Sequence, residues 1–286
     1  MAPQQVWFIT GTSTGLGRAL AEAVVARGEK VVATVRTPGV NQNLVEQAPD
    51  RVRSVLLDVT QPAQIDAAVQ RAQAEFGRID VLVNNAGYGL LGGVEEVTDE
   101  QLRRQIETNL LGSIRVTRAV VPLMRAQRSG HILQIASVGG QIAFPGLSLY
   151  HATKWGIEGF CEALAAEVAP FGIRVTIVEP GGIRTDFSER SLDVATPLAA
   201  YAQTPVDQMR QRLRSGSLPA LGDPAKMAGV ILNVARQPSP PLRLTLGSDA
   251  YQYERTALQA RLATVEAEEM LARSTDADDA VRQTHP

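Results

Sequence analysis

Apolar residues, many of them β-branched, recur along the chain in short runs of strand length. The runs cover residues 6–10, 31–35, 52–57, 81–84, 131–137, 174–179 and 242–246. Between most of them lie longer segments in which apolar residues recur at about every 3.6 positions, the spacing of an amphipathic helix. Strands that alternate with helices predict a parallel sheet. Because runs such as 81–83 are continuously apolar, both faces of the sheet must be buried, and we expect a doubly wound α/β fold with helices on each face.

Two local signals mark where helices begin and end. The apolar stripe at 65–76 stops at Gly77, and glycine commonly follows the end of a helix. Thr98 and Gln101 have the spacing of a capping box, in which each side chain bonds the backbone of the other residue. We therefore expect one helix to end at Gly77 and another to begin after Thr98.

The regular pattern loosens at residues 183–222, where prolines interrupt the apolar positions. Long irregular segments inside compact domains are usually functional, which favours a substrate lid; the alternative is an irregular helical cover over the core. Asp223 before Pro224 then predicts the start of another helix. We place the main domain at residues 1–250, and for 251–286 we expect an amphipathic helix packed on this or a neighbouring subunit, followed by a frayed acidic tail.

Composition narrows the classes of function. The chain has 286 residues, 44% of them hydrophobic, and a formal net charge of -2, as in ordinary globular proteins. Without a basic run there is no electrostatic signal for nucleic acid or an anionic membrane surface, so a small-molecule partner is expected. One cysteine, Cys161, excludes an intramolecular disulfide, and three histidines at unrelated spacings favour no metal site. Because an apolar run begins at Val6 and no stretch approaches about 18 apolar residues, we expect a cytoplasmic protein.

A glycine-rich turn follows the first predicted strand directly and opens a helix. Glycines let the backbone turn tightly and approach a pyrophosphate, which the free N–H groups of a helix N-terminus attract. The spacing departs from the common G-x-G-x-x-G, and the alternative is a plain turn between strand and helix; the βαβ context favours the nucleotide. The residues expected to hold the phosphates are Gly11, Ser13, Thr14, Gly15, Leu16 and Gly17.

The residue after the second predicted strand bears on the choice of nucleotide. An enzyme selective for NAD would carry an acid here for the ribose 2′-hydroxyl, whereas this chain has Arg36. A guanidinium is suited to a 2′-phosphate, and the hydroxyls of Ser13 and Thr14 can add hydrogen bonds. We therefore expect NADP(H) as the cofactor, with NAD(H) as the alternative. The alternative for Arg36 itself is a solvated surface arginine.

Further segments whose residues could take part in binding or catalysis follow along the chain. They are Asn-Asn-Ala-Gly at 84–87, Asn109, Ser137, Tyr150-x-x-x-Lys154 and Pro180-Gly181. With the glycine-rich turn, they make the chain resemble the short-chain dehydrogenase/reductase family in its single-domain form, over roughly residues 6–247. The resemblance implies a Rossmann-type fold and an oxidoreductase that interconverts a carbonyl and an alcohol by hydride transfer. It also implies a catalytic set of Asn109, Ser137, Tyr150 and Lys154.

The same resemblance implies which residues contact the cofactor. They are, for adenine, Asp58 and Val59; for the side of the adenosine ribose, Asn85, Ala86 and Gly87; for the nicotinamide, Pro180, Gly181, Ile183 and Thr185; and, beside the reacting centre, Tyr150 and Lys154. For 84–87 and 180–181 the alternative is a turn that ends a strand.

The proton chemistry follows from two residues one helical turn apart. A free tyrosine has a pKa of about 10, too high to exchange its proton readily at neutral pH, and a nearby cation lowers it. Lys154, four residues after Tyr150 on the same helix face, can be that cation. Tyr150 is then the general acid in reduction and the general base in oxidation, and Ser137 can bond the substrate oxygen. By the resemblance, Asn109 distorts its helix and holds a water that connects Lys154 to solvent.

Residues after strand ends and in the lid form the candidate substrate pocket, and nearly all are apolar. They are Tyr88, Leu90, Ile142, Phe144, Leu147, Phe187 and Leu192. An apolar pocket favours a hydrophobic ketone, aldehyde or secondary alcohol, while Arg184 and Arg190 leave an anionic substrate open. His151, adjacent to Tyr150 on a helix, points elsewhere and is not expected to be the base, and Cys161 is expected in the core.

Three functions compete. The first is an NADP(H)-dependent carbonyl reductase or alcohol dehydrogenase, the second an NAD-linked dehydrogenase of the same fold, and the third a non-catalytic nucleotide-responsive binding protein. The complete catalytic set favours an enzyme. By the resemblance a homodimer or homotetramer is expected, with Trp155 packed against a neighbour.

Overall fold

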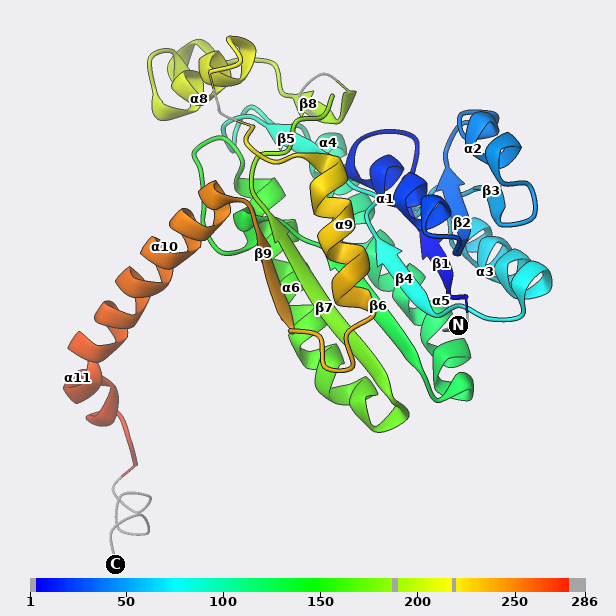
Figure 1. The fold of residues 1–286 in the computed structure, drawn as a ribbon. Helices are drawn as coiled ribbons and strands as arrows, with labels where there is room; N and C mark the ends of the chain where they lie inside the picture. Colours follow the sequence, from blue (N-terminus) through cyan, green and yellow to red (C-terminus); the bar gives the residue numbers. More distant parts are fainter. Residues whose placement is uncertain (1–3, 187–189, 218–219, 278–286) are drawn as a thin grey trace, which may run out of the picture.

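The computed structural model describes residues 4–186, 190–217 and 220–277, and its central feature is a seven-stranded parallel sheet (Figure 1). The strands lie in the order β3-β2-β1-β4-β6-β7-β9, and each neighbouring pair is parallel. Their bounds are β1 Val6–Ile9, β2 Lys30–Val35, β3 Val52–Leu56, β4 Val81–Asn84, β6 Gly130–Ile135, β7 Ile173–Pro180 and β9 Arg243–Leu246.

Helices cover both faces of this sheet. Successive residues of a strand point to opposite sides, and both sides carry apolar side chains that must be buried. In β1, Trp7 and Ile9 belong to a core shared with α1, α2 and α9, whereas Phe8 belongs to a second core shared with α3, α5 and α6. These helices are α1 Gly15–Ala26, α2 Gln42–Gln47, α3 Pro62–Phe76, α5 Ser113–Gln127, α6 Ser148–Val168 and α9 Pro224–Ala235. The predicted doubly wound α/β fold is therefore confirmed.

The local helix signals are confirmed as well. Gly77 takes the left-handed conformation after α3, and Thr98 forms a capping box with Gln101 at the start of α4 (Asp99–Ile106). The Asp223 carboxylate accepts hydrogen bonds from the first amides of α9. The largest difference from the predicted strand ends is in β6, which stops at Ile135 and not at residue 137, because the chain turns there into a short helix, Val138–Gly140, which Ser137 caps.

A second, two-stranded sheet lies near the carboxyl ends of the main strands and was not predicted. β5 (Gly89–Leu91) pairs in parallel with β8 (Leu192–Val194), which belongs to the irregular segment 183–222. The same segment carries α8 (Pro205–Arg214). Figure 1 shows β5, β8 and α8 grouped at one end of the molecule, beyond the sheet. The segment expected to be a lid is therefore partly built from regular elements.

The C-terminal helix extends away from the body of the molecule (Figure 1). In α10 (Ser248–Ala267), which α11 (Glu269–Arg273) follows, only Ala250 and Glu254 are buried. The predicted apolar stripe is exposed, and its members are Tyr251, Leu258, Leu262 and Val265. Packing of this stripe on a neighbouring subunit and a domain boundary at residue 250 stay predictions. Of the helices in the described ranges, none is long and apolar enough to cross a membrane.

A buried ion pair ties α8 to the rest of the molecule. Arg210 Nη2 lies 2.7 Å from Glu96 Oε2, and both side chains are almost entirely buried. The two oxygens of Glu96 also accept from the amides of Gly93 and Leu198. Burial raises the pKa of Glu96, but these two amides and the Arg210 guanidinium together bring it below its ordinary value. The docked α8 thus supplies the positive charge that pairs with Glu96.

Arg210→Met should lower the free energy of unfolding by about 3 kcal/mol, because it leaves the Glu96 carboxylate buried without its counter-ion. Urea unfolding followed by circular dichroism measures the change. Arg212→Met, at an exposed position of the same helix, is the matched control and should alter it by less than about 0.5 kcal/mol. Equal effects of the two substitutions would contradict the assigned role of the pair.

Candidate active site

A cavity of about 880 Å³ opens at the carboxyl ends of the strands. Open α/β sheets hold their ligand crevice at this edge, where the strand order reverses between β1 and β4. Two of the predicted site residues, Gly17 and Asn109, are not part of its lining. The others all line it, and they are Gly11, Ser13, Thr14, Gly15, Leu16, Arg36, Asp58, Val59, Asn85, Ala86, Gly87, Ser137, Tyr150, Lys154, Pro180, Gly181, Ile183 and Thr185.

The glycine-rich turn between β1 and α1 forms one wall of this cavity. Gly11 and Gly15 have positive φ angles of 69° and 60°, which explains glycine at both positions. A Cβ atom on Gly17 would overlap the Asn85 side chain and the Gly11 carbonyl oxygen. Asn85 holds this close approach, because its Nδ2 donates to the carbonyl oxygens of Thr10 at 3.0 Å and Gly11 at 2.8 Å. No described side chain caps α1, so its first amides remain open to an anion.

Arg36 and Asp58 border the cavity just beyond the ends of β2 and β3. Arg36 is exposed, and none of the described carboxylates forms an ion pair with its guanidinium. Asp58 Oδ1 accepts hydrogen bonds from the Thr60 amide at 2.9 Å and the Thr60 hydroxyl at 2.8 Å. The chain therefore orients the Asp58 carboxylate itself, whereas the Arg36 guanidinium is available to a ligand anion.

Ser137, just after β6, and Tyr150 and Lys154 of α6 line the same cavity. Helix α6 places Tyr150 and Lys154 one turn apart, with Lys154 Nζ 5.6 Å from the centre of the Tyr150 ring. Lys154 Nζ donates to the carbonyl oxygen of Ile135 at 3.0 Å, and Ser137 Oγ accepts from the Gly139 amide at 3.0 Å. The end of β6 therefore positions the ammonium and the hydroxyl together.

Burial is the largest influence on the pKa values of Tyr150 and Lys154. It raises the pKa of Tyr150, and the hydrogen bond with the Ser137 hydroxyl opposes it only in part. The rise is opposite to the lowering expected from Lys154, because the cost of desolvating a phenolate outweighs the other influences. Burial also lowers the pKa of Lys154 to about 8, against the Glu158 carboxylate, which raises it. Lys154 is therefore close to its titration point at neutral pH.

Asn109 lies in a π-helical turn, Glu107–Gly112, between α4 and α5, so the helix distortion implied by the resemblance is present. The buried side chain bonds both backbone groups of Tyr88. Its Nδ2 donates to the Tyr88 carbonyl oxygen at 2.8 Å, and its Oδ1 accepts from the Tyr88 amide at 3.0 Å. Both ends of the Asn109 amide thus hold the loop after β4, and the water that the resemblance implies stays a prediction.

The wall expected to be apolar also carries charge. Arg104 and Asp193, for which the sequence has no local signal, line the cavity as an ion pair between α4 and β8. The Arg104 guanidinium lies 5.5 Å from the centre of the Tyr88 ring. Of the two candidate arginines, Arg190 lines the cavity and Arg184 does not. Of the predicted pocket residues, Tyr88, Phe144, Leu147 and Leu192 line the cavity, Leu90 and Ile142 do not, and Phe187 lies outside the described residues.

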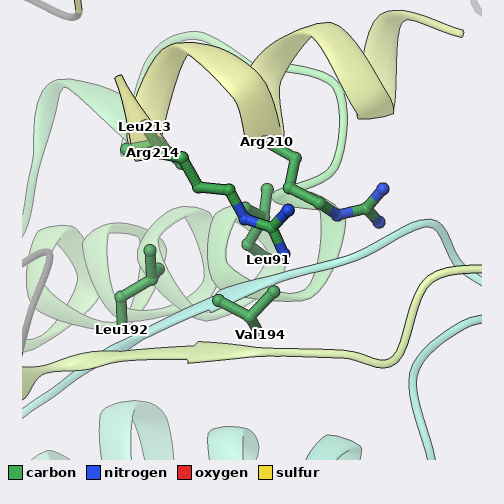
Figure 2. Close-up of a pocket in the computed structure, with 6 residues that line it drawn as sticks. All are labelled: Leu91, Leu192, Val194, Arg210, Leu213 and Arg214. Carbon is green, nitrogen blue, oxygen red and sulfur yellow. The ribbon is translucent and has the colours of Figure 1, made fainter. Parts of the chain in front are cut away.

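A smaller cavity of about 100 Å³ adjoins the large one (Figure 2). It shares Leu192 and Leu213 with the large cavity. Figure 2 shows the Arg214 guanidinium above Leu91 and Val194, between α8 and the small sheet. Parts of the segment 183–222 thus border both cavities; its movement as a lid stays a prediction.

His151 lines the cavity, so the expectation that it points elsewhere is wrong, but both of its ring nitrogens bond backbone groups of the chain. Because the Phe144 amide can only donate, His151 Nε2 accepts from it at 2.8 Å, and Nδ1 donates to the Gly139 carbonyl oxygen at 2.7 Å. Burial lowers the pKa of His151, so the neutral ring is favoured. Cys161 is buried, as predicted, and burial raises its pKa to about 12. Within the described part of the chain, no three His, Cys, Asp or Glu side chains form a group that could hold a metal ion.

Comparisons with known proteins agree with this fold. The family model described as short chain dehydrogenase matches residues 5–194. Oxidoreductase BOA17 of Botryotinia fuckeliana is 44% identical over 263 residues, which are 92% of this chain and 96% of that protein. The 3-ketodihydrosphingosine reductase of Bacteroides thetaiotaomicron is 35% identical over 248 residues, 85% of this chain and 88% of that protein. The crystal structure of a short-chain dehydrogenase from Streptomyces avermitilis has a TM-score of 0.90 and 42% identity, and the match covers 96% of this chain and 100% of that one. The chain belongs to the short-chain dehydrogenase/reductase family and is an oxidoreductase.

Proposed function

We propose that this oxidoreductase interconverts a hydrophobic ketone or aldehyde and the corresponding alcohol with NADP(H), with Tyr150 as general acid and base. One observation carries the proposal: Ser137, Tyr150 and Lys154 line the same cavity as the glycine-rich turn. A proton-transfer group and a phosphate-binding wall in one space are what carbonyl reduction by a dinucleotide requires.

The cavity walls suit a nicotinamide dinucleotide. The turn at Gly11 and Gly15 and the open amides of α1 can bind the pyrophosphate, and the Arg36 guanidinium suits a 2′-phosphate. When bound, the cofactor supplies or accepts the hydride. We assign adenine to Asp58 and Val59, the adenosine ribose to Asn85, Ala86 and Gly87, and the nicotinamide to Pro180, Gly181, Ile183 and Thr185.

The chain's own residues handle the proton. Tyr150 Oη donates it to the substrate oxygen in reduction and accepts it in oxidation. Ser137 Oγ accepts from the Gly139 amide, and its own proton can bond the substrate oxygen as charge develops there. Lys154, when protonated, stabilises the Tyr150 phenolate through its positive charge.

The substrate is proposed to be hydrophobic because Phe144, Leu147 and Leu192 line the cavity near its polar groups. The relative from Bacteroides thetaiotaomicron is named as a reductase of 3-ketodihydrosphingosine, a ketone, which supports a ketone substrate. We further propose a cytoplasmic homodimer or homotetramer, with the exposed Trp155 of α6 at an interface.

Tyr150→Phe tests the proposal directly. It should reduce kcat by at least about a hundredfold, since a positioned general acid contributes about 10² to 10⁴ in rate. The assay follows loss of NADPH absorbance with a panel of ketones and aldehydes. Quenching of tryptophan fluorescence by NADPH serves as the control and should be unchanged. A variant that binds NADPH and turns over as fast as the parent would refute the role of Tyr150.

Arg36→Asp should shift the preference from NADPH to NADH by at least about tenfold, because a carboxylate accepts the ribose hydroxyls and repels a 2′-phosphate. The measurement is the ratio of kcat/KM for the two cofactors. Arg255→Asp makes the same charge change at an exposed position of α10 and should leave the ratio unaltered. If both variants have the same ratio as the parent enzyme, Arg36 does not select the cofactor.

Lys154→Ala should depress turnover more than Ser137→Ala at neutral pH. Ser137→Ala removes one donor to the substrate oxygen, an effect of about a hundredfold. Lys154→Ala removes both the cation beside Tyr150 and a contact to the cofactor, and we expect a loss about tenfold larger. Steady-state kcat/KM of both variants, with circular dichroism as the control for folding, gives the order. Equal, mild losses would argue against it.

A further inference from the structure

On helix α6, the side that carries Tyr150 and Lys154 bears a third polar residue, Glu158, one turn further along. Tyr150, Lys154 and Glu158 are spaced four residues apart, so their side chains lie along the same side of the helix. Glu158 is 2% exposed, which is rare for a carboxylate. A buried acid one turn beyond the active-site lysine calls for a physical explanation.

The Glu158 carboxylate is held from two sides. Its Oε2 accepts from the Gln141 side chain and lies 2.8 Å from Arg243 Nη1 of β9. No described atom donates to its Oε1, which lies against Gly140 so closely that a Cβ there would overlap it. Gly140 ends the short helix that Ser137 caps. The carboxylate therefore supports the turn that carries Ser137.

Charge around Glu158 is unevenly distributed. The charged and titratable groups around it are Tyr150, Lys154, Cys161 and Glu162 of α6, Glu179 of β7, Arg243 of β9 and Glu254 of α10. Glu158, Glu179 and Glu254 are all buried, and Arg243 pairs with the first two. Burial, and then the Glu158 charge, raises the pKa of Glu179 to about 8. At neutral pH the protonated form of Glu179 is thus favoured.

We propose that Glu158 is a positioning residue of the active site: its buried carboxylate supports the Ser137 turn and provides a counter-charge one helical turn beyond Lys154. The inference rests on the proposed function, because it assigns Lys154 a cationic role. Glu158 touches neither the cavity nor the reacting atoms, since it is absent from the lining. It acts through Lys154 and through the turn.

The sign of the electrostatic effect is definite. The Glu158 charge raises the pKa of Lys154 and also that of Tyr150. Removing a negative charge destabilises the Lys154 ammonium and stabilises the Tyr150 phenolate, so both pKa values should fall together. A residue that only packed against its neighbours would change the rate without moving either value.

Glu158→Gln is the test, because glutamine keeps the shape and can still accept a hydrogen bond from Arg243. The alkaline limb of the reduction profile and the acid limb of the oxidation profile should both move to lower pH, by about 0.5–1 unit. Glu162→Gln is the matched control: this acid also pairs with Arg243 but is half exposed, and its profiles should coincide with those of the parent. Glu158→Asp keeps the charge and should restore the position of both limbs.

Gln141→Lys gives a second, independent arm, should Glu158→Gln fail to fold. It places a cation at a half-buried position beside the same carboxylate and should shift both limbs in the same direction. An active Glu158→Gln or Gln141→Lys enzyme with unmoved limbs would overturn the inference and leave the proposed function intact. A parent enzyme that oxidises and reduces nothing in the panel would refute the proposed function itself.

Discussion

Burial of both faces of the parallel sheet is the constraint on which the rest of the structure depends. Strand residues alternate between two cores, as Trp7 and Phe8 do in β1, so neither face is left for a ligand. A site must then form beyond the carboxyl ends, where turns replace packed side chains. The glycine-rich turn, Ser137 and the turn at Pro180 reach one cavity for this reason. Strand direction alone thus brings a phosphate-binding wall next to a proton-transfer group.

The same burial governs the charges at the edge of the sheet. An ammonium or carboxylate that loses its hydration is tolerated when an opposite charge or hydrogen bonds replace the water. Arg210 and Glu96 cancel each other in this way beneath α8. Near Lys154 the balance is different, because the buried carboxylates outnumber the cations and Glu179 is driven toward its protonated form. The Glu158 carboxylate opposes desolvation, which by itself lowers the pKa of Lys154.

Features set by neighbours in the sequence could be predicted, and features set by distant pairing could not. The spacing of Tyr150 and Lys154 determines that they share a helix face, and apolar runs were sufficient to locate the seven strands of the main sheet. By contrast, nothing local connects β5 to β8 or Arg104 to Asp193. Leu90 follows a strand end, yet β5 turns it into the interior, where it is 1% exposed. The prediction that the pKa of Tyr150 is lowered was wrong for a related reason, because helical spacing carries no information on how deeply the side chain is buried.

The match to the family model ends at residue 194. Residues beyond that point nevertheless pack around α6. Arg243 of β9 is the cation that Glu158 and Glu179 share, and Glu254 of α10 adds the third buried carboxylate. The Arg261 guanidinium of α10 lies 5.1 Å from the centre of the Trp155 ring and donates to the carbonyl oxygen of Gln141. The last strand and the C-terminal helix therefore contribute charged groups to the surroundings of Glu158. Because these contacts involve charge, a movement of α10 would alter the electrostatics of the site without altering any residue that lines the cavity.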